Sequence, residues 1–114
     1  MGKLTTHVLD TTSGTPASGV EVSLHILHGD KATLVKTLKT NSDGRCDSPL
    51  LEGSEFISGG YEIEFDVESY FRKNGTDCSF LKDVVIRFYV KDSEQNYHVP
   101  LLISPFSYST YRGS

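Results

Sequence analysis

The stretch "YEIEFDVES", residues 61–69, is the part of the sequence that decides the fold class. Its apolar residues Tyr61, Ile63, Phe65 and Val67 alternate with acidic residues, so an extended chain would point the two kinds to opposite sides. An alternation with a period of two is typical of a half-buried antiparallel strand. The stretch therefore predicts a strand that packs on a core with one face only.

Six further segments have strand-like composition, rich in β-branched and aromatic residues and separated by clusters of Gly, Pro, Asn, Asp and Ser. They are "LTTHVLD" (4–10), "VEVSLHIL" (20–27), "ATLVKTLKT" (32–40), "VVIRFYVKD" (84–92), "YHVPLLIS" (97–104) and "FSYSTY" (106–111). The one helical candidate is the short segment "ESYFRKNG" (68–75), which its Asn-Gly pair would end. We expect an all-β fold, an antiparallel β-sandwich of about eight strands in two sheets with one short helix, forming a single domain over residues 1–114.

Composition limits the classes of partner and compartment. The chain has 114 residues, of which 37% are hydrophobic and 23% charged, which is ordinary for a globular domain. The net charge of −4 argues against nucleic acid as a partner, and no apolar run approaches the roughly 20 residues of a membrane span. The start lacks a secretory signal, so we expect a cytoplasmic protein. Cys46 and Cys78 stand alone, and we expect free, buried thiols.

Histidines and arginines are the candidates for chemistry, and each signal is weak when taken by itself. His25 and His28 are a poor metal pair, because residues three apart on a strand face opposite sides. His7 shares its parity with Thr5, and Arg45 follows a turn that could direct its guanidinium toward an anionic or carbonyl-rich ligand. Pro100 cannot donate to a central ladder, so its strand should lie at an edge or carry a bulge, with His98 near an exposed margin.

The last residues, "YSTYRGS" (108–114), carry more specific chemistry than chain ends usually do. Together with "LTTHVLDT" (4–11), "DGR" (43–45) and "YHVPLLISPFSYSTYRGS" (97–114), this ending resembles the transthyretin-related proteins, specifically the hydroxyisourate hydrolases. The resemblance covers the whole chain, and "YRGS" is its most specific part. Hormone-carrying transthyretins share the fold but lack that ending. Two departures from the family pattern are Asn96, where histidine is frequent, and Ser107, where glycine is usual.

The resemblance implies an enzyme, a metal-independent cyclic amidase without cofactor. It would hydrolyse 5-hydroxyisourate, the unstable product of urate oxidation, to 2-oxo-4-hydroxy-4-carboxy-5-ureidoimidazoline. The implied catalytic residues are His7, His98 and Arg45. The implied substrate-binding residues are His7, Arg45, Tyr111, Arg112, Gly113 and Ser114. The resemblance also implies a homotetramer, a dimer of dimers joined along sheet edges, with sites where two dimers meet.

The chemistry of ring opening suits these groups. We expect His98 and His7 to handle the attacking water and the transferred proton, while Arg45 steadies the developing oxyanion. Which histidine is the base stays open. Direct attack by water is preferred to a covalent role for Ser114, since a terminal serine has no evident base beside it in the sequence. The alternative is a non-catalytic, transthyretin-like carrier of a small planar ligand. A peroxisomal location remains open if the source is eukaryotic.

Overall fold

The computed structural model describes all residues, 1–114, and contains nine strands, one α-helix and one 3-10 helix. The elements in chain order are β1 (Lys3–Asp10), β2 (Thr15–Pro16), β3 (Glu21–His28), β4 (Lys31–Lys39), β5 (Leu51–Glu52), η1 (Gly53–Glu55), β6 (Gly59–Asp66), α1 (Val67–Lys73), β7 (Asp83–Val90), β8 (Tyr97–Ile103) and β9 (Tyr108–Thr110). Each of the seven predicted strand segments contains a strand. Only β2 and β5, two residues each, lie outside the predicted segments. The predicted fold class is confirmed.

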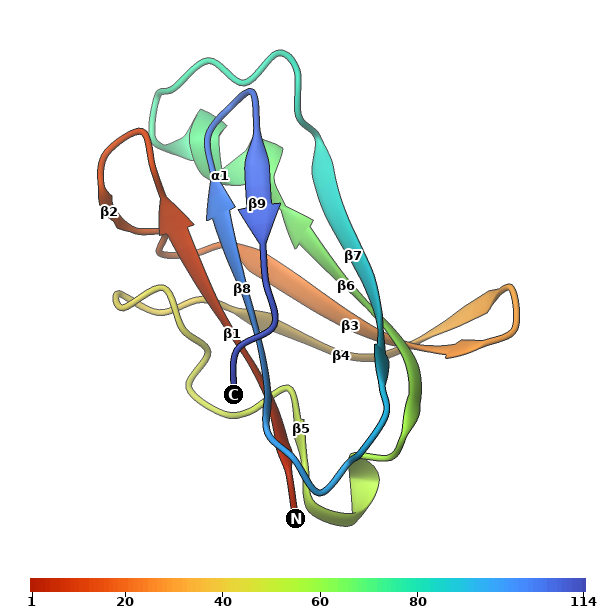
Figure 1. The fold of residues 1–114 in the computed structure, drawn as a ribbon. Coiled ribbons are helices and arrows are strands. Elements are labelled where there is room, and N and C mark those ends of the chain that lie inside the picture. The colour runs from red at the N-terminus through yellow and green to blue at the C-terminus, as the bar shows by residue number, and fades with distance from the viewer.

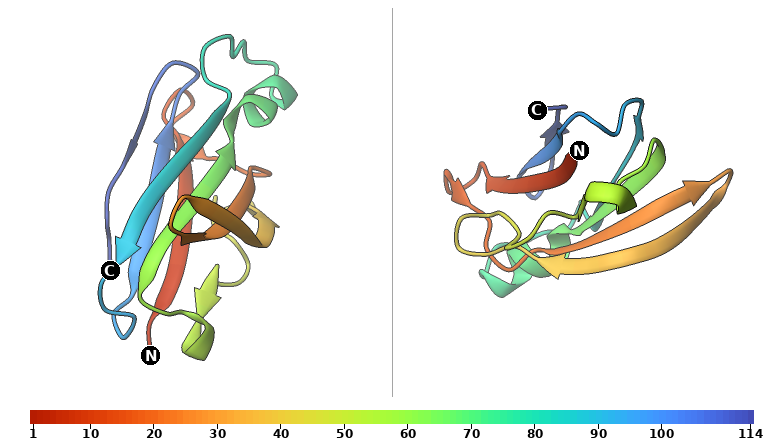
Figure 2. Two further views of the ribbon diagram at one scale, coloured as in Figure 1. Left: turned by 90° about the vertical axis from the view of Figure 1, so that its right-hand side faces the viewer. Right: turned by 90° about the horizontal axis from the view of Figure 1, so that it is seen from below.

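The strands form two sheets that face each other, as Figures 1 and 2 show. The first, called here the β1 sheet, has the order β2-β1-β8-β9, with β5 also paired to β1; the second, the β3 sheet, has the order β4-β3-β6-β7. All neighbours are antiparallel except β1 and β8, which run parallel in a register that pairs Leu4 with Tyr97 and Asp10 with Ile103. The parallel pair places the first strand of the chain beside one of the last.

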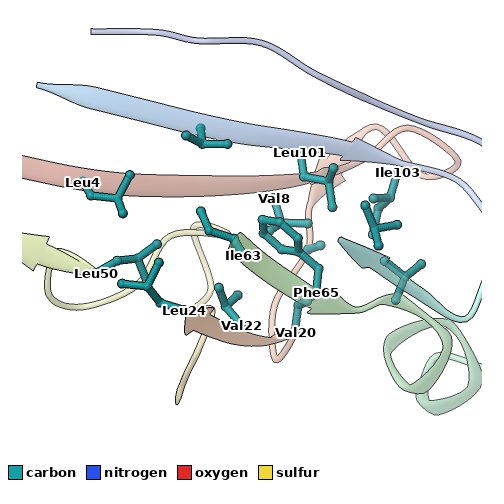
Figure 3. Close-up of a cluster of buried hydrophobic side chains, with 14 of the residues drawn as sticks. Leu4, Val8, Val20, Val22, Leu24, Leu50, Ile63, Phe65, Leu101 and Ile103 are labelled. Atoms are coloured by element: carbon teal, nitrogen blue, oxygen red, sulfur yellow. The ribbon is translucent and has the colours of Figure 1, made fainter. Parts of the chain in front are cut away.

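The core lies between the two sheets and contains 22 buried hydrophobic residues. Figure 3 labels ten of these side chains: Leu4, Val8, Val20, Val22, Leu24, Leu50, Ile63, Phe65, Leu101 and Ile103. Each large aliphatic or aromatic side chain that is fully buried contributes about 1.5–3 kcal/mol relative to exposure, so this layer supplies most of the stability. Because side chains alternate along a strand, the residues between these core positions point outward and remain available for other roles.

The junction between β6 and α1 differs in one detail from the prediction. The alternation predicted a strand through residue 69, and a helix was predicted over residues 68–75. The strand ends at Asp66, and the helix runs from Val67 to Lys73. The side chain of Asp66 accepts a hydrogen bond from the amide of Ser69 at 3.2 Å, which is the contact expected of a helix N-cap. The predicted stop is confirmed, since Gly75 has a φ of 74° directly after the helix. No helix here combines the length and the apolar run that a membrane crossing requires.

Pro100 lies inside a sheet, so the prediction of an edge strand or a bulge is wrong. Its strand, β8, is paired with β1 on one side and β9 on the other. Pairing with β9 covers only Leu101–Ile103, so the ladder stops where Pro100 would have to donate. The carbonyl of Pro100 instead accepts a hydrogen bond from the hydroxyl of Thr110 at 2.7 Å. The proline therefore marks the point at which the last strand leaves the regular ladder.

A buried polar contact joins the end of β1 to α1. The residue Asp10 is only 6% exposed, and its Oδ2 accepts a hydrogen bond of 2.8 Å from the hydroxyl of Tyr70. Its Oδ1 accepts hydrogen bonds from the amides of Thr12 and Ser13 at 2.9 and 3.4 Å. Burial, followed by the contact with the Asp10 carboxylate, raises the pKa of Tyr70 to about 12. The tyrosine hydroxyl therefore stays protonated and keeps donating throughout the physiological range.

The variant Tyr70→Phe should lower the free energy of unfolding by about 1–3 kcal/mol, because one oxygen of a buried carboxylate loses its donor. Thermal unfolding at pH 7 measures the change. Ser54→Ala is the control, since Ser54 is exposed and its replacement should leave the melting temperature unchanged. Equal melting temperatures for Tyr70→Phe and the parent protein would contradict a stabilising role for this contact.

Candidate active site

Two of the predicted catalytic residues lie on the outer face of the β1 sheet. His7 of β1 and His98 of β8 are half-buried and lie between buried neighbours in each strand, so both point away from the core. The parallel register pairs Thr5 with His98 directly, and His7 follows two residues further along the same face. The imidazole ring centroids are 6.4 Å apart and the rings are tilted by 39°. The prediction that His7 and Thr5 share a face is confirmed.

Arg45 reaches the same face from the loop before β5. It forms an isolated antiparallel bridge with His7, and the loop is tied to β1 by a hydrogen bond of 2.8 Å from the amide of Val8 to the carbonyl of Gly44. Gly44 has a φ of 76°, and a Cβ at this position would clash with the carbonyl oxygen of Val8. Only glycine fits this close approach. The "DGR" sequence thus places a guanidinium beside an imidazole.

The protonation pattern of His7 follows from its hydrogen bond. Its Nε2 lies 2.9 Å from the carbonyl oxygen of Asp43. A carbonyl oxygen can only accept, so Nε2 must carry the proton and donate it. In neutral His7 the free lone pair is therefore on Nδ1.

His98 is set up differently. Its Nδ1 lies 2.8 Å from the hydroxyl oxygen Oγ1 of Thr5, a contact in which either group could donate. Burial, then the positive charge of Arg45, then His7 lower the pKa of His98 below its ordinary value of 6.5. All three causes disfavour the imidazolium. His98 is therefore neutral at pH 7, the form that can accept a proton.

The end of the chain is fixed to His98. The amide of Gly113 donates to the carbonyl of His98 at 2.7 Å, and the amide of His98 donates to the carbonyl of Gly113 at 3.2 Å. A Cβ on Gly113 would lie 3.2 Å from the Cβ and 3.3 Å from the Cδ2 of His98. The glycine therefore lets the backbone pack against the imidazole. His7, Arg45, His98 and Gly113 are brought together, and Ser114 follows directly as an exposed residue.

The other two residues of the terminal motif point elsewhere. Tyr111 is 60% exposed and lines an apolar cleft of about 280 Å³ between β7 and β8. Arg112 donates through Nη2 to the side chain of Gln95 and the carbonyl of Asn96, and its guanidinium carbon lies 4.3 Å from the ring centroid of Tyr97. Within one chain, these two side chains do not join the imidazole cluster.

Some residues of the site carried no strong signal in the sequence. Thr5 contacts His98, and only its shared parity with His7 hinted at that position. Asn41 shapes the loop of Arg45, because its Oδ1 accepts hydrogen bonds from the amides of Asp43 and Arg45 at 2.9 and 3.2 Å. A polar hollow of about 210 Å³ opens beside the cluster and is lined by Lys3 as well as by Thr5 and Arg45.

The remaining candidates lie outside this cluster. Both cysteines are free thiols, as predicted, but only Cys78 is buried, while Cys46 is half-buried. Burial is the main cause that raises the pKa of each above its ordinary value. His25 lies 3.9 Å from Glu62 on β6 rather than near the site. No group of three or more His, Cys, Asp or Glu side chains could hold a metal ion.

Comparison with known proteins identifies the family. A sequence profile described as "HIUase/Transthyretin family" matches residues 4–113. A curated relative, 5-hydroxyisourate hydrolase 2 of Rhizobium meliloti (strain 1021), is 53% identical over 116 residues, which cover 99% of this chain and 97% of the relative.

Solved structures of three kinds share the fold. The Klebsiella pneumoniae 5-hydroxyisourate hydrolase has a TM-score of 0.82 and 34% identity, covering 98% of this chain and 99% of that one. Sea bream transthyretin in complex with thyroxine has a TM-score of 0.89 and 29% identity, covering 97% and 94%. (S)-allantoin synthase has a TM-score of 0.93 and 45% identity, covering 99% of this chain but only 44% of that chain.

The titration of His98 should reflect the charge of Arg45. We expect an NMR midpoint below 6.5, and we expect Arg45→Gln to raise it, because one of the causes that lower the pKa of His98 is removed. Since a lowered pKa means that the folded protein binds less proton than the unfolded chain, this group's contribution to stability decreases as the pH falls below 6.5. Arg72→Gln, on helix α1, is the control and should leave the midpoint in place. A midpoint that does not respond to Arg45→Gln would contradict the interaction.

Proposed function

The chain belongs to the HIUase/Transthyretin family, and from this premise we propose that it is a hydrolase that opens the ring of 5-hydroxyisourate. The product of this cyclic amide hydrolysis is 2-oxo-4-hydroxy-4-carboxy-5-ureidoimidazoline, and the reaction is a step in urate degradation. The observation that carries the proposal is the convergence of His7, Arg45, His98 and the backbone of Gly113 on one face of the β1 sheet. We expect neither a metal ion nor a cofactor to take part.

Hydrolysis of a cyclic amide makes three demands. A water molecule must lose a proton as it attacks, the carbonyl oxygen must carry negative charge as the carbon becomes tetrahedral, and the leaving nitrogen must gain a proton. The imidazoles of His7 and His98, whose ring centroids are 6.4 Å apart, and the guanidinium of Arg45 can together meet all three. The proposed roles follow from the hydrogen bonds that each group already makes.

His98 is proposed as the general base. It is neutral at pH 7, and donation from its Nδ1 to Thr5 would leave the lone pair of Nε2 free to accept the proton of water. Burial, then Arg45 and His7, lower the pKa of His98, so the imidazolium formed after attack is also a stronger acid. It can therefore pass the same proton to the leaving nitrogen. His7, held by the carbonyl of Asp43, would orient the substrate or the water through Nδ1.

Arg45 and the chain end complete the proposed site. The guanidinium of Arg45 would bind the oxygen-rich substrate and stabilise the oxyanion. Gly113 allows the backbone to approach, while Tyr111, Ser114 and the terminal carboxylate would supply hydrogen bonds to the flat heterocycle. Water attacks directly in this scheme, and Ser114 forms no covalent intermediate. Arg112 was expected to bind the substrate directly, but its side chain contacts residues 95–97 instead.

The site favours hydrolysis over simple carriage of a ligand. The similarity to a thyroxine-bound transthyretin makes a carrier the natural alternative. A carrier of an apolar planar ligand needs an apolar surface, whereas this outer face presents two imidazoles, a guanidinium and a pinned chain end. A neutral His98 can accept a proton and the guanidinium of Arg45 can donate hydrogen bonds, which are the properties that acid–base chemistry uses.

We include a homotetramer in the proposal. Strands β7 and β9 each lie at an edge of a sheet with unpaired backbone groups. Large exposed side chains accompany these edges, among them Tyr89, Tyr108 and Tyr111. Pairing of identical edges across two-fold axes would cover them and could bring Tyr111 of one subunit toward the site of another. A cytoplasmic location is also proposed, and the two free thiols suit a reducing compartment.

The variant His98→Asn should reduce kcat by about 10²–10⁴-fold, the range expected for loss of a general base. His7→Asn should reduce it less, because its proposed role is orientation. The assay generates 5-hydroxyisourate with urate oxidase and follows its decay in the near ultraviolet, after subtraction of the spontaneous rate. His28→Asn, an exposed histidine at the end of β3, is the control. Unchanged decay with His98→Asn would refute the assignment.

Assembly can be tested by sedimentation velocity. We expect a species of four chains of 12.6 kDa each. Val85→Lys introduces a charge on the edge strand β7, where two-fold pairing would bring like charges together, and it should shift the protein to smaller species. A fully active monomer would show that the site needs no second chain.

A further inference from the structure

The segment that follows β9 is held by the sheet at Gly113 but not at the two residues before it. The strand ends at Thr110, and the next backbone hydrogen bonds to β8 are those of Gly113. Tyr111 and Arg112 make no backbone hydrogen bond at all. The pairs Leu101↔Thr110 and His98↔Gly113 keep one antiparallel register, so the segment stays beside β8 although Pro100 cannot donate to Tyr111. Side-chain contacts can help to hold it there.

The side chain of Arg112 makes the contacts that can do this. Its Nη2 donates to Oε1 of Gln95 at 3.1 Å and to the carbonyl oxygen of Asn96 at 3.0 Å. Its guanidinium carbon lies 4.3 Å from the ring centroid of Tyr97, in cation–π contact. The three partners are consecutive, and the residue that follows them is His98. We refer to these contacts of Arg112 with residues 95–97 as the arginine clamp.

The platform under the arginine clamp is rigid. Tyr97 is only 8% exposed, and its hydroxyl accepts a hydrogen bond of 3.1 Å from the amide of Lys91. Its ring also packs edge-on against Phe56 at a centroid distance of 6.1 Å. The guanidinium therefore rests on a ring that the core already fixes in place.

The arginine clamp and the Gly113 pair hold β8 from opposite faces. Tyr97 points toward the core side of the sheet and His98 toward the outer face, so Arg112 and Gly113 contact the strand on either side of its plane. We propose that Arg112 is a positioning residue, whose clamp on residues 95–97 sets Gly113 and Ser114 against the His98 imidazole without contacting the substrate. The proposal rests on the proposed hydrolase function for its kinetic consequence.

The kinetic test compares Arg112→Ala, Gln95→Ala and the double variant. If Arg112 acts through the clamp, Arg112→Ala should lower kcat by about tenfold or more with KM changed less than about threefold, because misplacement of a catalytic group affects the chemical step. Gln95→Ala should lower kcat in the same direction but less. The kcat of the double variant should lie within about twofold of the kcat of Arg112→Ala, since both changes break the same contact between Arg112 and Gln95.

A substrate ligand would behave differently. KM would rise with Arg112→Ala, Gln95→Ala would have no effect, and Arg112→Lys would restore binding through its charge. If Arg112 acts through the arginine clamp, Arg112→Lys should restore only part of kcat. Lysine lacks the planar guanidinium that donates to Gln95 and Asn96 while it lies over the ring of Tyr97. Arg72→Ala, which removes another exposed arginine on α1, is the control and should keep the parent kcat and KM.

Hydrogen exchange tests the arginine clamp without relying on activity. The Gly113 amide, bonded to the His98 carbonyl, should exchange at least about tenfold faster in Arg112→Ala and measurably faster in Gln95→Ala, with global unfolding unchanged. If the parent protein does not hydrolyse 5-hydroxyisourate but the exchange changes as expected, the clamp stands and the proposed function fails. Unchanged Gly113 exchange in Arg112→Ala, or additive kinetic effects with Gln95→Ala, would overturn the clamp.

Discussion

The parallel pairing of β1 with β8 is the constraint on which the site depends. It is the one parallel contact in an otherwise antiparallel sandwich, and its register places Thr5 directly beside His98. A shift of one residue would turn every side chain of one strand to the opposite face, burying His98 and exposing Val99. The buried side chains of both strands therefore fix which histidines face outward, and core packing and site geometry share one register.

Pro100 of β8 and Thr110 of β9 then determine how the end of the chain reaches the outer face of the β1 sheet. Pro100 cannot donate on the side of β9, so regular pairing stops at Leu101 and the hydroxyl of Thr110 satisfies the proline carbonyl. The ladder lacks backbone hydrogen bonds for two residues and resumes in the same register at Gly113, where the absence of a Cβ allows contact with the imidazole of His98. An ordinary continuation of the β9 ladder would have required a donor that proline lacks. The interruption is what leaves room for a chain end with its own contacts.

Local patterns in the sequence predicted the strands and the helix, because each depends on neighbours in the chain. The alternation in β6 and β1 and the Asn-Gly stop after α1 belong to this class, and β6 was overextended only because Asp66 serves as a helix cap. Local patterns could not predict contacts between segments that lie far apart in the sequence. Thr5 and His98 are 93 positions apart, and Arg112 meets residues 95–97 on the face opposite His98. The resemblance named His7, Arg45, His98 and Gly113, which lie together in the structure, but it could not assign the direction of each side chain.

A sandwich can host either a ligand carrier or a catalyst, because the core constrains only the inward positions. In this chain the outward positions of β1 and β8 hold imidazoles whose protonation is controlled by contacts from elsewhere in the chain. The carbonyl of Asp43 fixes the proton of His7 on Nε2, and burial together with Arg45 lowers the pKa of His98. Binding alone would not require this control, since a planar ligand can be held by apolar contacts and a few fixed donors. Proton transfer does require it, because a base must be neutral before attack and acidic enough afterwards to release its proton to the leaving nitrogen.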